Sequence, residues 1–309
     1  MSLPRLRRSA QAALAALVFV PLAACATPEA APAHTPAPSA QQAATAQQNT
    51  DFAQLERTFD ARLGVYAVDT GTGREVGYHA EDRFAYASTH KVFSAGALLQ
   101  KTPVEGLDRR VSYGQGDLVP NSPITKKNLG TAPTATITLR AAMDASLRYS
   151  DNTADNLVFR EIGGPAGMAA ALRGVGDTVS HPDRIEPDLN EATPGDIRDT
   201  TTPRAFANSL RAFALGDALP ADRRAVLTDT MRANTTGDAL IRAGVPAGWQ
   251  VADKTGGANY GTRNDIAVIW PPQRAPIVLV VLSDKKAKDA KYDDKLIAQA
   301  TTAALGALR

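Results

Sequence analysis

The sequence predicts an α/β plus all-α architecture: a five-stranded antiparallel sheet flanked by N- and C-terminal helices, with an inserted all-helical domain. Alternating apolar residues typical of strands occur near 62–80 and again at 249–284, whereas the long segment between has mostly helical spacing. Hairpin-length connections join the three late strands, which favours antiparallel pairing. We therefore expect one shared sheet, an α/β domain at 51–85 and 232–309, and an all-helical domain at 86–231.

The elements follow in order along the chain. The spacing of Phe52, Leu55, Phe59 and Leu63 predicts a helix from Asp51 to about Arg62. Two strands then flank a Thr-Gly-Thr-Gly turn at 70–73. Helical patterns fill 88–243, interrupted by polar loops at 112–130 and 180–201. The late strands are WQVADKT, DIAVIWP and PIVLVVLSD, and the closing helix is YDDKLIAQATTAALGAL.

Residues 1–24 have the features of a signal peptide. The basic stretch MSLPRLRR precedes an apolar run, at 12–24, that is too short to span a bilayer comfortably. The run ends in Leu-Ala-Ala-Cys, which resembles a bacterial lipobox, so we expect export and lipidation of Cys25. Plain secretory cleavage is the alternative, and Arg7-Arg8 leaves twin-arginine export open. A periplasmic or other extracytoplasmic protein, anchored to the membrane, is the expected result.

The segment at 25–50 is expected to be a disordered tether after the lipidated cysteine. It is rich in Ala, Pro and Gln and lacks aromatic residues. Cys25 is the only cysteine of the chain, so no intrachain disulfide can form. Three of the 34 basic residues lie in residues 1–24, which hold none of the 32 acidic residues, so the rest of the chain is close to neutral. We expect no nucleic-acid partner and a monomer.

Four short motifs could carry chemistry, and each is common by itself. Ser88-Thr89-His90-Lys91 begins a helix, where residues three apart are neighbours, but a capping serine and a solvated lysine would give the same pattern. The other three could be helix caps, a charged surface loop or a turn. They are Ser150-Asp151-Asn152, the loop from Arg184 to Asn190, and Lys254-Thr255-Gly256-Gly257.

In this order and spacing, the four motifs together resemble the class A serine β-lactamases. The resemblance extends from Phe52 to the C-terminus, and KTGGANYGTRNDIAVIWPP is an especially close match. It implies a β-lactamase/transpeptidase-like fold and hydrolysis of the β-lactam amide of penicillins and cephalosporins through a seryl acyl-enzyme, which confers antibiotic resistance. No cofactor is implied.

The resemblance also implies roles for individual residues. Ser88 corresponds to the nucleophile, Ser150 to the group that passes a proton to the departing nitrogen, and Glu186 with Asn190 to the holders of the hydrolytic water. The backbone N–H groups of Ser88 and Gly257 would form the oxyanion hole. Residues implied to bind substrate are Asn152, at the acyl amide, and Lys254, Thr255 and Arg263, at the carboxylate.

The loop at 184–199 is expected to be an omega loop that Arg184 and Asp199 clamp at its neck. The alternative for this pair is an exposed ion pair worth under about 1 kcal/mol. The family also suggests a cis peptide bond between Glu186 and Pro187.

The ordinary pKa values of lysine and glutamate indicate which residue is the better candidate for the base. Neutral Lys91 at pH 7 would require its pKa to fall by about 3.4 units from about 10.4, whereas a glutamate with a pKa near 4.3 is already ionised. We therefore favour Glu186, acting through water, as the base in both half-reactions, with Lys91 anchoring Ser88. The acylation base remains open, because coupled protons can make the assignment ill-posed.

Two further functions share many of these features. A penicillin-binding DD-peptidase would have the serine, the lysine and the K-T-G motif without a glutamate placed for deacylation. An acylated sensor would react once and stay modified. A metal-dependent lactamase is disfavoured because the histidines lack metal-ligand spacing. His90 is expected to serve in helix packing or to support the catalytic residues without taking part in the chemistry. The four histidines are His34, His79, His90 and His181.

Overall fold

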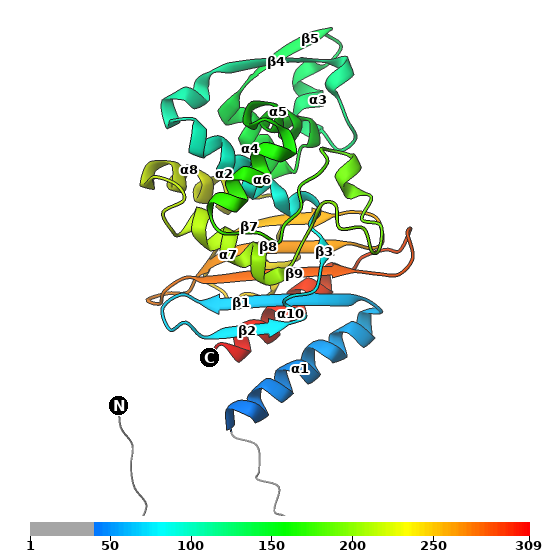
Figure 1. Ribbon diagram of the computed structural model, residues 1–309, viewed down its shortest axis with the longest axis vertical. Coiled ribbons are helices and arrows are strands. Elements are labelled where there is room, and N and C mark those ends of the chain that lie inside the picture. The colour runs from blue at the N-terminus through cyan, green and yellow to red at the C-terminus, as the bar shows by residue number, and fades with distance from the viewer. Residues whose placement is uncertain (1–39) are drawn as a thin grey trace, which may run out of the picture. The chain divides into compact units, whose positions relative to one another are not determined.

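The computed structural model describes residues 40–309 (Figure 1). The expected signal peptide, Cys25 and the first part of the tether lie outside this range, as does His34. The helices are α1 (Ala40–Phe59), α2 (Lys91–Lys101), α3 (Pro123–Leu129), α4 (Leu139–Tyr149), α5 (Asn152–Ile162), α6 (Gly164–Gly174), α7 (Pro203–Ala214), α8 (Ala221–Arg232), α9 (Ile241–Gly244) and α10 (Asp294–Ala307). Single 3₁₀ turns are η1 (Ala87–His90), η2 (Val104–Asp108), η3 (Gln115–Asp117) and η4 (Asp188–Asn190).

One five-stranded antiparallel sheet organises the chain, in the order β2-β1-β9-β8-β7. Its strands are β1 (Arg62–Asp69), β2 (Glu75–Tyr78), β7 (Gln250–Gly257), β8 (Arg263–Trp270) and β9 (Ile277–Asp284). The early strand β1 pairs with the late strand β9, with Tyr66 opposite Val280. The prediction that strands from both ends of the sequence share one sheet is therefore confirmed.

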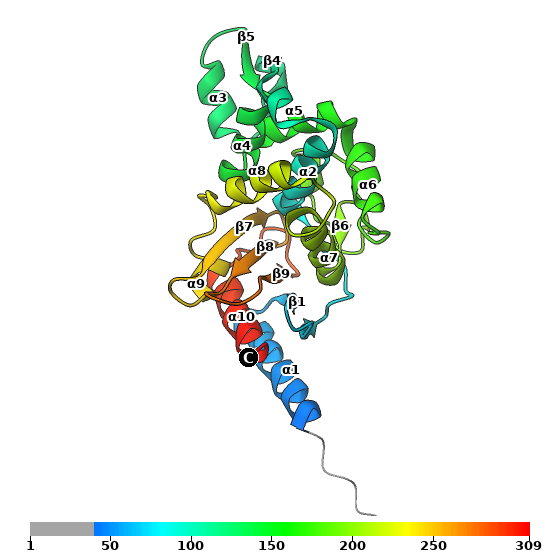
Figure 2. The same ribbon diagram turned by 90° about the vertical axis from the view of Figure 1, so that its left-hand side faces the viewer.

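Both faces of the sheet are buried. Along β9, Leu279 and Val281 join a core with Phe52 of α1 and Ile297 of α10, so the two terminal helices cover one face (Figure 2). The alternate residues Val278 and Val280 belong to a second core that includes α7 and α2. Burial on both sides explains why β9 is a continuous apolar run instead of an alternating one.

The structure differs from the expected architecture in two places. Helix α1 begins at Ala40 instead of near Asp51, so the expected disordered tether does not extend over 40–50; Ala and Gln in this segment are good helix formers. The inserted region is not all helical, because β4 (Arg110–Gly114) pairs with β5 (Thr134–Thr138). Alternating Val111 and Tyr113, opposite Ile137, give this hairpin one buried side.

Two short strands connect the nucleophile region to the loop at 184–199. Strand β3 (Phe84–Ala85) pairs with β6 (Thr200–Thr201), so the chain entering η1 lies beside the chain leaving the loop. Within residues 40–309, no helix has the length and apolar character needed to cross a membrane.

Candidate active site

Ser88 lies on a tightly held turn at the start of α2. Its side chain is buried, and its Oγ is 3.4 Å from Oε1 of Glu186. The preceding residue, Ala87, has a φ of 47°, a left-handed conformation that is unfavourable for a residue with a Cβ. Asn264 holds the turn by donating from Nδ2 to the carbonyl oxygen of Tyr86 over 3.1 Å. The turn thus presents the hydroxyl in a conformation that its surroundings impose.

Strand β7 approaches this turn closely because residue 256 is glycine. A Cβ at Gly256 would lie 3.0 Å from the carbonyl oxygen of Tyr86 and 3.2 Å from the Cβ of Ala87. The close approach brings the following residue, Gly257, to the same cleft as Ser88; the cleft has a volume of about 400 Å³. The two backbone groups expected to form the oxyanion hole therefore line one cavity.

Lys91 is fully buried at the centre of the polar cluster. Its Nζ is 3.0 Å from Oε1 of Glu186, and it donates to Oδ1 of Asn152 over 2.6 Å and to the carbonyl oxygen of Ser150 over 3.0 Å. The alternative of a solvated helix-start lysine is therefore wrong. The ammonium group of Lys91 therefore joins three parts of the sequence: its own motif at 88–91, the motif at 150–152, and Glu186.

Ser150 links the two buried lysines. It occupies the C-terminal cap of α4 with a φ of 55°, and its Oγ accepts from Nζ of Lys254 over 3.1 Å and from Nζ of Lys91 over 3.4 Å. Burial, followed by the positive charge of Lys91, lowers the pKa of Lys254 to about 7. A hydroxyl between two amines is well placed to pass a proton.

Different residues bind the backbone and the side chain of Glu186. The peptide bond between Glu186 and Pro187 is cis. Asn156 of α5 donates from Nδ2 to the Glu186 carbonyl oxygen over 2.8 Å and accepts from the Glu186 N–H over 3.0 Å. Nδ2 of Asn190 donates to Oε2 of Glu186 over 2.5 Å, while Oδ1 of Asn190 is a buried acceptor without a protein donor. A polar acceptor of this kind beside a carboxylate suits a bound water.

The pair expected at the loop neck is present and shielded. Nε of Arg184 lies 2.5 Å from Oδ2 of Asp199, whose side chain is only 1% exposed. The other oxygen of Asp199 accepts from the Arg184 N–H and from the hydroxyl of Tyr86, both over 3.0 Å. Because Tyr86 also belongs to the nucleophile turn, the contact joins that turn to the loop that carries Glu186.

Comparisons with known proteins agree with this geometry. The family model described as "Beta-lactamase enzyme family" matches residues 47–308. A β-lactamase of Bacillus licheniformis is 57% identical over 258 residues, which cover 84% of this chain and 83% of the relative. A crystal structure of a class A β-lactamase from Clostridium kluyveri superposes with a TM-score of 0.82 at 48% identity, covering 85% of this chain and 99% of that one.

The chain belongs to the class A serine β-lactamase family. The Beta-lactamase 3 of Bacillus cereus is a further relative, 52% identical over 262 residues that cover 85% of this chain and 82% of that protein. The expected β-lactamase/transpeptidase-like fold is confirmed by the superposition and by the five-stranded sheet.

Gly257, the last residue of the K-T-G strand β7, lines the cleft, and Thr255 and Arg263 lie near it. The hydroxyl of Thr255 is 2.6 Å from that of Thr236, and Nε of Arg263 is 2.6 Å from Oδ1 of Asp294. A Cβ at Gly257 would be 3.6 Å from Nη1 of Arg263, so the guanidinium lies beside the last residue of β7. Arg263 thus lies beside a residue that lines the cleft, whereas Lys254, Thr255 and Arg263 are not among the lining residues themselves.

Sequence reasoning missed three residues that hold this site. Asn156 follows Asn152 by one helical turn, and that spacing was the available signal for its role. Thr236 and Asp294 lie far along the chain from their partners Thr255 and Arg263, and the motifs contain no signal for them.

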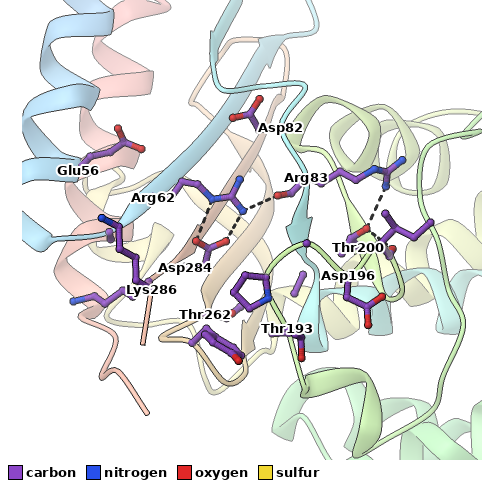
Figure 3. A pocket seen from close by; sticks show the side chains of 18 of the residues that line it. Glu56, Arg62, Asp82, Arg83, Thr193, Asp196, Thr200, Thr262, Asp284 and Lys286 are labelled. Carbon is purple, nitrogen blue, oxygen red and sulfur yellow. Dashed lines mark hydrogen bonds and ion pairs between the residues drawn. The ribbon is translucent and has the colours of Figure 1, made fainter. Parts of the chain in front are cut away.

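A larger cavity of about 960 Å³ lies apart from this chemistry, between the start of β1, β3 and the far side of the omega loop (Figure 3). Ser88, Lys91 and Glu186 are absent from its lining. In its wall, Arg62 pairs with Asp284 at 2.5 Å. Ser88, by contrast, lines the smaller cleft.

Proposed function

We propose that this β-lactamase hydrolyses the amide bond of penicillins and cephalosporins through an ester on Ser88, and thereby confers antibiotic resistance. The observation that carries the proposal is the separation of 3.4 Å between Oγ of Ser88 and Oε1 of Glu186. At that separation one water can contact both oxygens, so the same carboxylate can serve formation and hydrolysis of the ester.

In the acylation step, the Ser88 oxygen adds to the lactam carbonyl carbon and the carbon–nitrogen bond of the ring breaks. The backbone N–H groups of Ser88 and Gly257 would bind the developing oxyanion, and Ser150 would deliver the proton to the nitrogen. Because Lys91 is ion-paired with Glu186 at 3.0 Å, we assign removal of the Ser88 proton to Glu186 through water, with Lys91 as the positioning cation. The proton then passes from Glu186 through Lys91 to Ser150, whose Oγ is 3.4 Å from Nζ of Lys91, so Ser150 regains its proton and Glu186 is ionised again before deacylation.

In the deacylation step, Glu186 takes a proton from water, whose oxygen adds to the acyl carbon. Asn190 would hold this water through its unpartnered Oδ1, and Ser88 leaves with its proton restored. Asn152 would contact the acyl amide of the drug, although its own amide already donates from Nδ2 to the carbonyl oxygen of Pro120 over 3.0 Å. The clamp of Arg184 and Asp199 would keep Glu186 in place.

Multiple-turnover hydrolysis of a chromogenic cephalosporin, with and without a chelator, tests this function. We expect many turnovers per protein and the same rate in both samples, because the proposed groups are all side chains and backbone of this chain. A single stoichiometric release followed by a stable adduct would indicate a sensor. Cleavage confined to D-alanyl peptides would indicate a DD-peptidase, and loss of rate with chelator would indicate a metal enzyme.

The shifted pKa of Lys254 predicts a pH dependence. With a pKa of about 7 in the folded protein, Lys254 loses its charge, and with it part of the attraction for a substrate carboxylate, as pH rises through 7. We expect kcat/KM for a penicillin, which reports the free enzyme, to fall above that pH. In Lys254→Arg, whose guanidinium stays charged, the basic limb should move to higher pH. An unmoved limb would assign it to another group.

The same shift predicts the sign of a stability effect. In the unfolded chain Lys254 binds its proton up to a pH of about 10.4. Between pH 7 and that value the folded state binds fewer protons, so the contribution of Lys254 makes unfolding less favourable as pH rises.

We further propose export and anchoring through a lipid on Cys25, with a monomer as the active form. The support is the basic stretch, the short apolar run and the Leu-Ala-Ala-Cys sequence at 22–25.

A further inference from the structure

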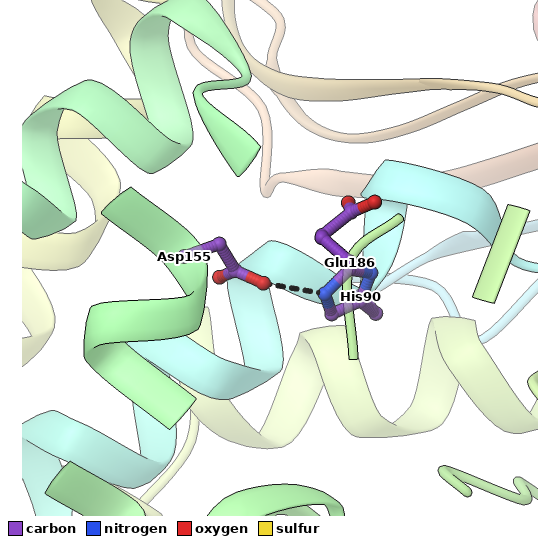
Figure 4. A group of neighbouring side chains, drawn as sticks. All are labelled: His90, Asp155 and Glu186. Atoms are coloured by element: carbon purple, nitrogen blue, oxygen red, sulfur yellow. Dashed lines mark hydrogen bonds and ion pairs between the residues drawn. The ribbon is translucent and has the colours of Figure 1, made fainter. Parts of the chain in front are cut away.

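His90 and Asp155 form a fully buried pair, and His90 follows Ser88 by two residues (Figure 4). Nε2 of the His90 ring is 2.7 Å from Oδ2 of Asp155, and Nδ1 is 2.7 Å from the carbonyl oxygen of Ala87. The imidazole, the Asp155 carboxylate and the Glu186 carboxylate bring one polar atom each within 4.8 Å of one another. Both ring nitrogens are engaged, so His90 is a hydrogen-bonding group here and not a free ligand.

The partners of the two nitrogens restrict where the protons can be. A carbonyl oxygen can only accept, so Nδ1 of His90 must carry a proton. An ionised Asp155 can also only accept, in which case Nε2 carries a proton as well and the ring is an imidazolium. The alternative is a neutral ring that accepts a proton from an un-ionised Asp155.

The surroundings favour the ionised pair. The second oxygen of Asp155 accepts from the hydroxyl of Ser94 over 2.7 Å and from that of Ser146 over 3.0 Å, leaving no partner that requires an acidic proton. Burial raises the pKa of Asp155, but His90, Lys91 and these bonds outweigh it and hold the pKa below its ordinary value. The charged groups around the His90 ring are Asp155, Glu186 and the adjoining Lys91.

The remaining faces of the ring are aromatic. Phe159 stacks on the His90 ring with a distance of 5.4 Å between the two ring centroids. The centroid of the Tyr86 ring also lies 5.4 Å from that of His90. The hydroxyl of Tyr86 is engaged with Asp199, and burial raises its pKa well above the ordinary value, so it stays neutral.

The bond from His90 acts on a specific peptide group. The carbonyl of Ala87 and the N–H of Ser88 belong to the same planar peptide, so fixing the carbonyl fixes the direction of the N–H. That N–H is one of the two expected oxyanion donors. A charged donor on the carbonyl oxygen also polarises the peptide and strengthens its N–H as a donor.

We propose that His90, held as an imidazolium by Asp155, is a positioning residue that orients and strengthens the Ser88 N–H of the oxyanion hole. The kinetic consequence of this proposal rests on the proposed acyl-enzyme function. The protonation state of the His90–Asp155 pair does not depend on that function. Asp155 lies one turn beyond Asn152 on α5, so the same pair also fixes the Ser88 turn against the helix that carries the Ser150–Asn152 motif.

The protonation state is tested by nitrogen-15 NMR of the histidine rings in the full chain. The His90 resonances are assigned by their loss in His90→Phe. We expect both ring nitrogens of His90 to carry a directly bonded proton at pH 7, because each faces an acceptor. An unprotonated Nε2 at pH 7 would overturn the proposal, whether or not the protein hydrolyses β-lactams.

The kinetic consequence is tested with Asp155→Asn, which keeps the shape. The new amide can donate to Nε2, so the ring becomes neutral while Nδ1–H still reaches Ala87. We expect acylation by a penicillin to slow about threefold to tenfold at an unchanged melting temperature. The double variant His90→Phe/Asp155→Ala should lose about 10²-fold, the scale of one oxyanion donor. Wild-type acylation in the folded double variant would overturn the positioning role.

A spectroscopic measurement separates orientation of the donor from general stability. In a Glu186→Gln background, the infrared carbonyl stretch of the trapped acyl-enzyme reports hydrogen bonding to the acyl oxygen. Adding Asp155→Asn should move the stretch to higher wavenumber, because the donor weakens, while His79→Gln should leave it unchanged. No movement with Asp155→Asn would count against the polarising role. If no acyl-enzyme forms in any sample, the proposed function fails and the NMR result stands alone.

Discussion

Glu186→Gln should turn the protein into a trap that forms an ester with a penicillin and hardly hydrolyses it. Glutamine keeps the length, and its one amide oxygen can still accept from Lys91, but the amide cannot accept a proton from water. Removing a positioned general base costs about 10²- to 10⁴-fold, and in deacylation no other described carboxylate lies as close to Ser88 as Oε1 of Glu186, at 3.4 Å.

Intact-protein mass spectrometry after mixing with excess penicillin measures this trap directly. In the wild type the adduct should form and disappear quickly. In the variant it should form more slowly, because Glu186 is also the proposed base of acylation, and then persist. Its melting temperature must be measured, because the change leaves the buried Lys91 without its counter-charge. Glu81→Gln, which alters an exposed residue paired with Arg204, is a matched control and should hydrolyse normally. Rapid release of product by folded Glu186→Gln would contradict the assignment.

The sequence motifs predicted the members of the site but not how they are held. Ser88, Lys91 and Lys254 were recognisable because a short motif fixes each of them on a helix start or a strand end. The pairing of Asn156 with Glu186 was not, because it joins a helix to a loop 30 residues away. The role of an asparagine on a helix cannot be predicted until its hydrogen-bond partner is known, because many side chains at that spacing serve only in packing.

The fold was predictable to the extent that periodicity reflects burial. The hairpin around 70–73 and the late strands follow from turn chemistry and apolar alternation. The continuous apolar run of β9 could not reveal that Leu279 and Val278 enter different cores, because a strand buried on both sides has no periodic signal. The β4 and β5 hairpin was hidden for a different reason: its alternation is short, and only Val111, Tyr113 and Ile137 mark its buried side.

The pair of His90 and Asp155 illustrates a further limit. The histidine was expected either to pack in its helix or to support the catalytic residues, and it does pack, with Phe159 on its face. Its chemical significance comes from the acceptor that its Nδ1 meets, the carbonyl of Ala87, and that contact depends on the left-handed backbone of the turn. The sequence contains the two residues 65 positions apart, with no pattern to join them.

Ser88→Ala should abolish both the adduct and turnover. Without the hydroxyl no ester can form, and the remaining oxyanion hole and bound water supply only residual catalysis, so kcat should fall on the order of 10⁴- to 10⁶-fold. The turn should persist, because its carbonyl oxygens are held by Asn264, Thr89 and His90 and not by the serine side chain. The melting temperature should therefore stay close to that of the wild type.

Hydrolysis of a chromogenic cephalosporin and adduct mass are the measurements, with Ser112→Ala, an exposed serine on β4, as the matched control. Wild-type turnover in Ser88→Ala would show that the nucleophile is another group. A stable adduct in that variant would locate it, since peptide mapping would identify the modified residue. Loss of both in Ser88→Ala, together with a persistent adduct in Glu186→Gln, would show that the serine forms the ester bond and that hydrolysis of this bond requires the glutamate.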